Sequence, residues 1–241
     1  FRKLFPAGAT EPPTPKAGSP SEGDADAAKA PSPLGARGLD GPLPLEAVLD
    51  AIEKASKVAD ALGPFMAFST KNDESNLFKL RKAQQALART NAGVKYATVR
   101  ELLEAEKESG VHKPGAVLAD PSAAMALLWL RRTLSYQASF LASAARTADA
   151  SAFSTLVREG YSKCLEPYHG WLLKNTFMMA FAALPSRDEC LRRLAPRIKQ
   201  PNLRREMVIN DIDEGVPMMN KLVAVLADLF IELDLEDTRK S

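Results

Sequence analysis

The sequence predicts an all-α protein of about eight helices packed as layers. Beyond residue 44, apolar side chains recur every three or four residues, which is the spacing of a buried helix face. The prolines of this part of the chain gather between the periodic segments, as is typical of helix boundaries. No stretch alternates apolar and polar residues between turn residues, so the pattern does not indicate a sheet. We therefore expect a helical domain over 45–241.

The first three helices have separate signals. Residues 45–62 place eight apolar side chains at helical spacing, and Gly63 and Pro64 are expected to end that helix. A second helix is expected over 72–89 and a third over 98–109, which ends next to a glycine.

The fourth helix is expected to be long. Asp120 is predicted to cap it with Pro121 at the first helical position, and its apolar pattern reaches to about Ala145. Further helices are expected over 151–166, 167–184, 187–199 and 205–234.

Residues 1–44 have a different composition. They hold nine of the 17 prolines, and between Phe5 and Leu34 they contain no aromatic residue and no Val, Ile, Leu or Met. Such a segment cannot offset the entropy lost on ordering. We expect a disordered Pro/Gly/Ala-rich linker or tail over 1–44. Because the chain opens with Phe1 instead of Met, we also expect the natural product to be longer.

Composition excludes several classes of protein. The 32 basic and 30 acidic residues give a net charge of +2, which argues against a nucleic-acid binder. Two distant cysteines do not form a disulfide framework, and no apolar run reaches the length of a membrane span. We expect a cytoplasmic, monomeric protein.

The sequence lacks the common signatures of catalysis. It has no Gly-rich phosphate loop, no H-E-x-x-H and no G-x-S-x-G, and its two histidines cannot build a multi-histidine metal site. A pair of Cys164 and His169 would lie on different helical faces. We expect no enzyme activity, no metal and no cofactor.

A few polar and aromatic residues remain unexplained. Asn72, Asn76 and Lys79 are spaced i, i+4, i+7 and form one polar stripe on the second helix. Trp129 lies in an apolar stretch of the fourth helix, and His169 precedes an apolar helix. Taken singly, each is also typical of a solvated helix face or of an ordinary core, so the residues alone leave both interpretations open.

At these same positions the chain resembles the glycolipid transfer protein family. The resemblance is carried by Thr98–Glu108, which is similar to the family's "L-x-x-I-L-E-x-E-K-E", by Ala126–Arg132, similar to "A-L-x-W-L-K-R", and by Tyr168–Trp171, which matches "Y-H-G-W". It implies a two-layer helical sandwich that encloses the chains of one sphingolipid, and non-enzymatic transfer or sensing of glycosphingolipids at membranes. A transient membrane surface would then be the second partner.

The resemblance also implies roles for single residues. Trp129 would stack against the first sugar, Asn76 and Lys79 would bond its hydroxyls, and His169 would donate to the ceramide amide carbonyl. Arg132 corresponds to a basic residue near the headgroup. Trp171 corresponds to a tryptophan that docks on the bilayer.

The match departs from the family at one headgroup position. The family's aspartate, which accepts the amide N–H, is replaced by Asn72, which loses the charge assistance of the hydrogen bond. A local shift that brings in Asp73 instead is the alternative, although Asp73 lacks partners at i+4 and i+7. We favour Asn72.

A sugar headgroup is favoured over a phosphate. The branch that resembles ceramide-1-phosphate transfer proteins has Lys at the position of Asn76 and Arg at those of Trp129 and Met125. This chain has no basic residue at any of the three positions. Transfer of a phosphorylated ceramide and a helical protein-interaction module remain the alternatives. Seven residues are candidates to line the apolar cavity: Phe65, Phe68, Tyr136, Phe140, Leu165, Phe177 and Phe181.

Overall fold

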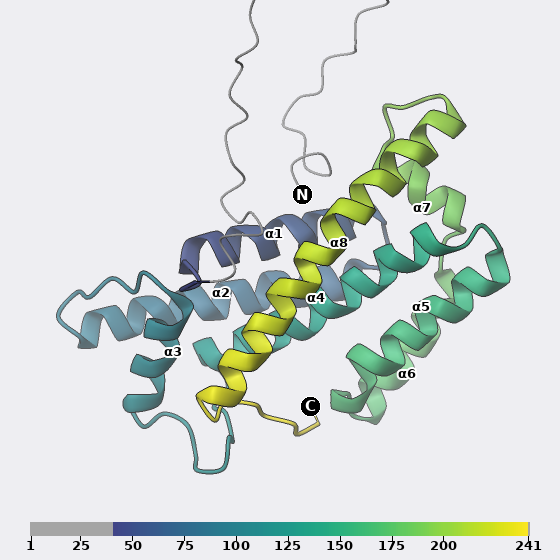
Figure 1. Ribbon diagram of the computed structural model, residues 1–241. Helices are drawn as coiled ribbons and strands as arrows, with labels where there is room; N and C mark the ends of the chain where they lie inside the picture. Colours follow the sequence, from purple (N-terminus) through teal and green to yellow (C-terminus); the bar gives the residue numbers. More distant parts are fainter. Residues whose placement is uncertain (1–40, 241) are drawn as a thin grey trace, which may run out of the picture.

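A computed structural model describes residues 41–240 of the chain, and its regular structure there is helical (Figure 1). Two isolated bridges are the only extended pairings among the described residues. The prediction of an all-α fold is confirmed. The helices are α1 (Leu45–Ala61), α2 (Ala67–Thr90), α3 (Val99–Glu108), α4 (Ala123–Arg146), α5 (Ala150–Cys164), α6 (Trp171–Ala180), α7 (Arg187–Leu194) and α8 (Pro201–Glu232), with short 3₁₀ turns η2 (Glu166–Tyr168) and η3 (Phe181–Ala183).

The predicted tail over 1–44 lies outside the described residues except for its last four. Among these, Leu43 is buried, and its carbonyl accepts a hydrogen bond from the backbone N–H of Val99. Pro44 then serves as the N-cap residue of α1. The packed part of the chain therefore includes Leu43.

The start of α2 lies earlier than predicted. The helix begins at Ala67 rather than near Asn72, because the turn after α1 is short: Gly63 adopts a left-handed φ of 84°, and Met66 already serves as the N-cap residue. This extra turn of helix carries Phe68 and Ser69 beside the polar stripe.

The N-terminus of α4 differs from the prediction. Ser122, and not Asp120, caps the helix by accepting a hydrogen bond from the backbone N–H of Met125. The buried carboxylate of Glu106 in α3 accepts two more N–H groups, from Ala123 at 2.6 Å and Ala124 at 2.7 Å. Negative charge is favourable at a helix N-terminus, so Glu106 fixes α4 against α3 and leaves Asp120 available for another role.

Helix α4 is the centre of the fold. It packs along α2, α5 and α8, and α8 crosses it as the longest element (Figure 1). Most of its residues are buried, which explains its nearly continuous apolar sequence. None of the helices in the described part is long and apolar enough to cross a membrane.

The second half of the chain is more broken than predicted. The expected helix over 167–184 divides into η2, an extended step at His169 and Gly170, then α6 and η3. The helix expected over 187–199 ends at Leu194, and α8 begins at Pro201, earlier than the predicted residue 205. Proline at a first helical position needs no N–H partner, which accounts for the earlier start.

Aromatic rings fill the interior between α2, α4, α5 and α6. Phe65 lies 5.7 Å from Phe140 and 5.9 Å from Phe181, and Tyr161 stacks on Phe177 at 4.7 Å between ring centroids. A space of about 10 Å³ remains beside these rings, which is about the smallest that can hold one water molecule. Six of the seven residues predicted to line a cavity are aromatic, and their rings pack against one another or against Tyr161. The seventh, Leu165, lines the surface pocket described below.

Candidate functional site

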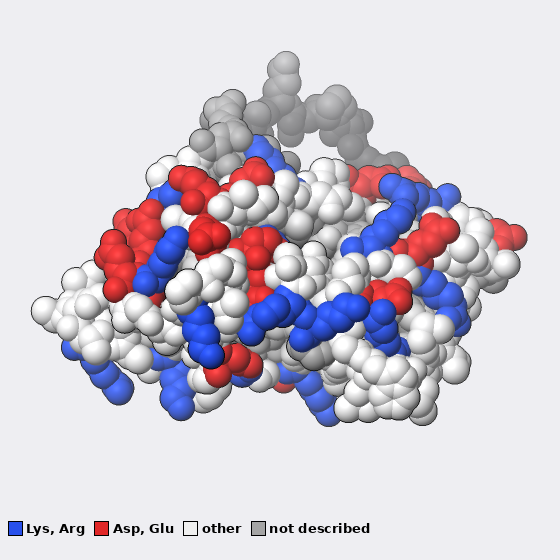
Figure 2. Space-filling model, turned by 90° about the horizontal axis from the view of Figure 1, so that it is seen from below, with Lys and Arg blue, Asp and Glu red and all other residues white. Residues whose placement is uncertain are grey.

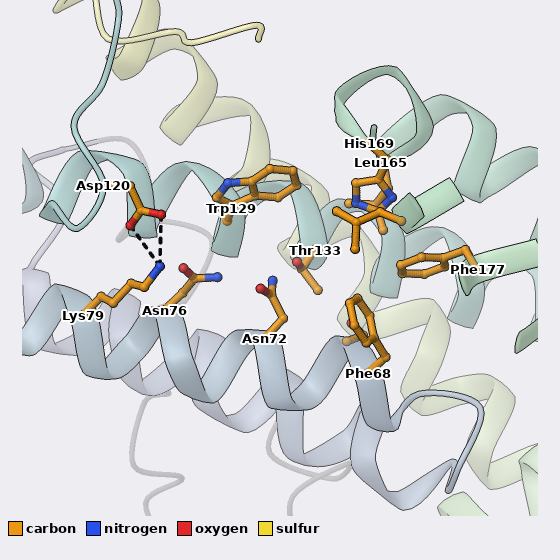
Figure 3. A pocket seen from close by; sticks show the side chains of 12 residues that line it. Phe68, Asn72, Asn76, Lys79, Asp120, Trp129, Thr133, Leu165, His169 and Phe177 are labelled. Carbon is orange, nitrogen blue, oxygen red and sulfur yellow. Dashed lines mark hydrogen bonds and ion pairs between the residues drawn. The ribbon is translucent and has the colours of Figure 1, made fainter. Parts of the chain in front are cut away.

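One pocket at the surface brings together all five residues expected at the headgroup site (Figure 3). Its volume is about 210 Å³, and it lies between α2, α4 and the segment around η2. One end is polar and the other is apolar. The lining residues are Phe68, Ser69, Asn72, Asn76, Lys79, Asp120, Trp129, Thr133, Leu165, His169, Leu173 and Phe177.

The polar stripe of α2 forms one wall of this pocket. Lys79, Asn76 and Asn72 follow one another along the helix toward Phe68 (Figure 3). Asn76 is 3% exposed, and its side-chain Nδ2 has no hydrogen-bond partner among the described residues. A buried amide N–H without a partner costs free energy, so Asn76 offers a donor to a bound molecule.

Asp120 closes the polar end of the pocket. Its carboxylate accepts hydrogen bonds from Lys79 Nζ at 2.9 and 3.2 Å. The sequence does not predict Asp120 in the pocket, because Asp before Pro is typical of a helix cap and nothing in the sequence links Asp120 to Lys79, which lies 41 residues away. The pair leaves the pocket without net charge at this end.

Trp129 lies on the opposite wall, on α4. Its ring centroid is 5.7 Å from that of His169, with an angle of 28° between the planes. The Arg132 guanidinium lies 5.3 Å from the Trp129 ring and 3.5 Å from the Tyr168 ring. Arg132 is buried and bonds Glu236 and the Asp237 carbonyl, so it orients the aromatic rings and does not line the pocket.

His169 is a buried, uncharged ring. Desolvation by burial, together with the nearby Arg132 and Lys174 charges, lowers its pKa to about 4. Its Nδ1 is 3.1 Å from the Tyr161 hydroxyl. When that hydroxyl donates to Nδ1, the neutral imidazole carries its proton on Nε2 and presents a hydrogen-bond donor there.

Asn72 and Asp73 occupy different environments. Asn72 lines the pocket, whereas Asp73 does not line it and is 1% exposed. Gln137 Nε2 donates to Asp73 Oδ2 at 2.8 Å, which joins α2 to α4. Burial is the main cause that raises the Asp73 pKa to about 7. Of the two alternatives from the sequence, the geometry therefore favours Asn72 as the pocket residue.

Apolar residues form the other end of the pocket. Phe68, Leu165 and Phe177 were predicted to line an internal cavity, and here they border the surface pocket where it meets the aromatic interior. Phe68 is 45% exposed and lies 5.7 Å from Phe177, edge to face. Three further lining residues, Ser69, Thr133 and Leu173, have no distinctive sequence signal.

Trp171 begins α6 outside the pocket and is 78% exposed. Leu172, Met178 and Met179 on the same helix are also exposed, so α6 presents an apolar surface. On the face in Figure 2, basic and acidic side chains are interspersed, with an uncharged area at the lower right of the view. An amphipathic indole beside exposed apolar side chains is a combination found at membrane interfaces.

The chain is similar to proteins that transfer glycolipids. A family model described as Glycolipid transfer protein (GLTP) matches residues 43–196. Glycolipid transfer protein 2 of Arabidopsis thaliana is 28% identical over 192 residues, which are 80% of this chain and 78% of the relative. Pleckstrin homology domain-containing family A member 8 of Homo sapiens is 27% identical over 197 residues, but the match covers only 35% of that relative's length.

Solved structures have the same fold. One is a structure of FAPP2, reported as selecting simple glycosphingolipids using the GLTP-fold. It is 26% identical with a TM-score of 0.69, and the match covers 84% of this chain and 92% of that one. The mouse ceramide-1-phosphate transfer protein is 21% identical with a TM-score of 0.67, over 83% of this chain and 92% of that one. The second likeness shows a shared fold alone.

Proposed function

Because the chain belongs to the glycolipid transfer protein family, a family of lipid transfer proteins, we propose that it binds one glycosphingolipid and carries or senses it at membranes without changing it chemically. The sugar lies in the pocket between α2 and α4, and the hydrocarbon chains enter the aromatic interior. No cofactor takes part in this scheme.

The main observation in favour of a sugar headgroup over a phosphate is that the pocket has no net charge. Among the described residues that line the pocket, Lys79 is the one Lys or Arg, and Asp120 neutralises it, while His169 is uncharged at neutral pH. A phosphate headgroup needs unpaired cationic donors, whereas sugar hydroxyls are satisfied by neutral amides and by a paired ammonium. The alternative, a phosphorylated ceramide, therefore fits this lining less well.

Each pocket residue then has a defined contact. Trp129 supplies a flat apolar face for the first sugar ring, and Asn76 and Lys79 bond its hydroxyls. The Asn72 oxygen accepts the ceramide N–H, and His169 Nε2 donates to the ceramide carbonyl. Because a neutral acceptor is weaker than a carboxylate, the Asn72 contact is about 1 kcal/mol weaker than a charge-assisted one.

The hydrocarbon chains supply most of the binding free energy. About 30 methylenes at about 0.8 kcal/mol each make exposure of the chains to water prohibitive. The aromatic rings of Phe65, Tyr136, Phe177 and Phe181 must separate to admit them, because they contact one another in the structure. Trp171 and the exposed side of α6 would hold the protein on the bilayer during exchange. We further propose that the protein acts as a cytoplasmic monomer.

A transfer assay between vesicles tests the proposal. Donor vesicles with fluorescent galactosylceramide or with ceramide-1-phosphate of the same acyl chain are mixed with unlabelled acceptors. We expect transfer of the sugar lipid, and loss of most of it in Trp129→Ala and in His169→Leu. Phe78→Ala, which removes an exposed aromatic side chain of α2 outside the pocket, is the matched control. Full transfer by the Trp129 and His169 variants would refute the site.

A further inference from the structure

Two buried hydroxyl groups lie where the headgroup pocket meets the aromatic interior. Ser69 and Tyr136 are 5% and 0% exposed, and neither Ser69 Oγ nor Tyr136 Oη has a hydrogen-bond partner among the described residues. Buried hydroxyls are normally paired, because an unpaired one forfeits its bonds to water. Two such groups near one site indicate a polar partner that binds there.

Their neighbours make the pair unusual. The other hydroxyl groups around the same space are engaged: Thr133 bonds Asp73, Thr176 Oγ1 donates to the Leu172 carbonyl, and the Tyr161 hydroxyl pairs with His169. The local fold can therefore satisfy its hydroxyls. Ser69 and Tyr136 are the exceptions.

Ser69 lies closer to the aromatic interior than the polar stripe of α2 does. Ser69 lies three residues before Asn72 on α2, about 4.5 Å along the helix axis. It lines both the headgroup pocket and the small interior space, whereas Tyr136 lines only the interior space. The polar stripe thus continues one turn deeper than Asn72, toward the side where the hydrocarbon chains enter.

We propose that this protein selects sphingolipids that carry an additional hydroxyl group next to the ceramide amide. The inference rests on the proposed function, in which Asn72 and His169 hold the amide. A hydroxyl on the second carbon of the acyl chain, or on the fourth carbon of the sphingoid base, lies within a few bonds of that amide. It therefore lies near Ser69, one helical turn from Asn72, and next to the small space that Ser69 and Tyr136 both line, whereas an unsubstituted chain leaves both hydroxyls unpaired.

The preference can be measured as a ratio of transfer rates. Three galactosylceramides of equal chain length are compared: one without the additional hydroxyl, one with a 2-hydroxyacyl chain and one with a 4-hydroxysphinganine base. Since one buried hydrogen bond corresponds to about a five-fold change in affinity, we expect the better hydroxylated lipid to be favoured by about that factor. The two hydroxylated lipids reveal which hydroxyl group is recognised.

Two variants test the residues separately. Ser69→Ala and Tyr136→Phe each remove one hydroxyl with little change of shape, and we expect either to bring the ratio close to one. Using both keeps the test decisive if one variant folds poorly, which a thermal unfolding scan reveals. Thr176→Val is the matched control, because it removes a neighbouring hydroxyl that already has a partner, and the ratio should persist.

The outcomes are distinguishable. Equal transfer of all three lipids by the natural chain would overturn this inference and leave the proposed function standing. Transfer of no glycosphingolipid at all would overturn both. A preference that persists in Ser69→Ala and in Tyr136→Phe would also overturn the inference, because other groups would then recognise the hydroxyl.

Discussion

Replacing Asp120 by Asn should shift the headgroup preference toward phosphate. The substitution keeps the shape of the side chain and removes the carboxylate that accepts two hydrogen bonds from Lys79. The polar end of the pocket then gains one unpaired positive charge.

The size of the shift follows from the exposure of the pair. A phosphate charge about 4 Å from the ammonium gains about 4 kcal/mol at an effective dielectric constant of about 20. The side chains of Lys79 and Asp120 are 34% and 53% exposed, so water and salt screen this interaction. We therefore expect about 1 to 2 kcal/mol, which is about a 5- to 30-fold gain for ceramide-1-phosphate relative to galactosylceramide.

The assay is a competition between the two lipids at low and at high salt. The gain should shrink as the salt concentration rises, because screening weakens an interaction between partly exposed charges. Asp50→Asn is the matched control, since it removes one carboxylate from an ion pair with Lys54 on α1, outside the pocket. An unchanged lipid ratio in Asp120→Asn, or an equal gain in Asp50→Asn, would refute the argument from pocket charge.

Three further predictions concern single positions. Asn72→Asp should strengthen galactosylceramide binding about five-fold by restoring a charged acceptor, as measured by titration with lipid vesicles; weaker binding would contradict the role of Asn72. The native state raises the Asp73 pKa from 3.8 to about 7, so its contribution to stability is fully present below pH 4 and is lost as pH rises toward 7. Asp73→Asn should remove this component, at most about 4 kcal/mol, from urea unfolding free energies between pH 4 and 7; an identical pH profile would exclude it. Trp171→Ala should reduce vesicle association and transfer several-fold without changing the affinity for lipid in detergent, and a loss of that affinity would place Trp171 in the binding site.

The sequence predicted the parts of the site that depend on one helix. Asn72, Asn76 and Lys79 share a wall of the pocket because helical periodicity alone sets their relative directions. The all-α class followed from the same periodicity. These features need no knowledge of how the helices pack.

Features that depend on packing could not be predicted. The pairing of Asp120 with Lys79 requires the loop before α4 to meet α2, and the sequence offered a more ordinary role for Asp120 as a cap. The contact between the rings of Phe68 and Phe177 likewise depends on how α6 folds back toward α2. The break in the helix at Gly170 also depends on packing, because the apolar pattern on both sides is compatible with one continuous helix.

The buried hydrogen bond from Gln137 to Asp73 makes one side of the binding region more rigid than the other. It joins α2 to α4 inside the protein, so it would resist separation of the two walls between which the headgroup is proposed to bind. The rings of Phe177 and Phe181 touch Phe68, Tyr136 and Phe65 through apolar contacts, which can slide apart without breaking a polar bond. In the proposed binding mode, hydrocarbon chains of different length would be accommodated where these apolar contacts separate, while the same sugar would be recognised between α2 and α4.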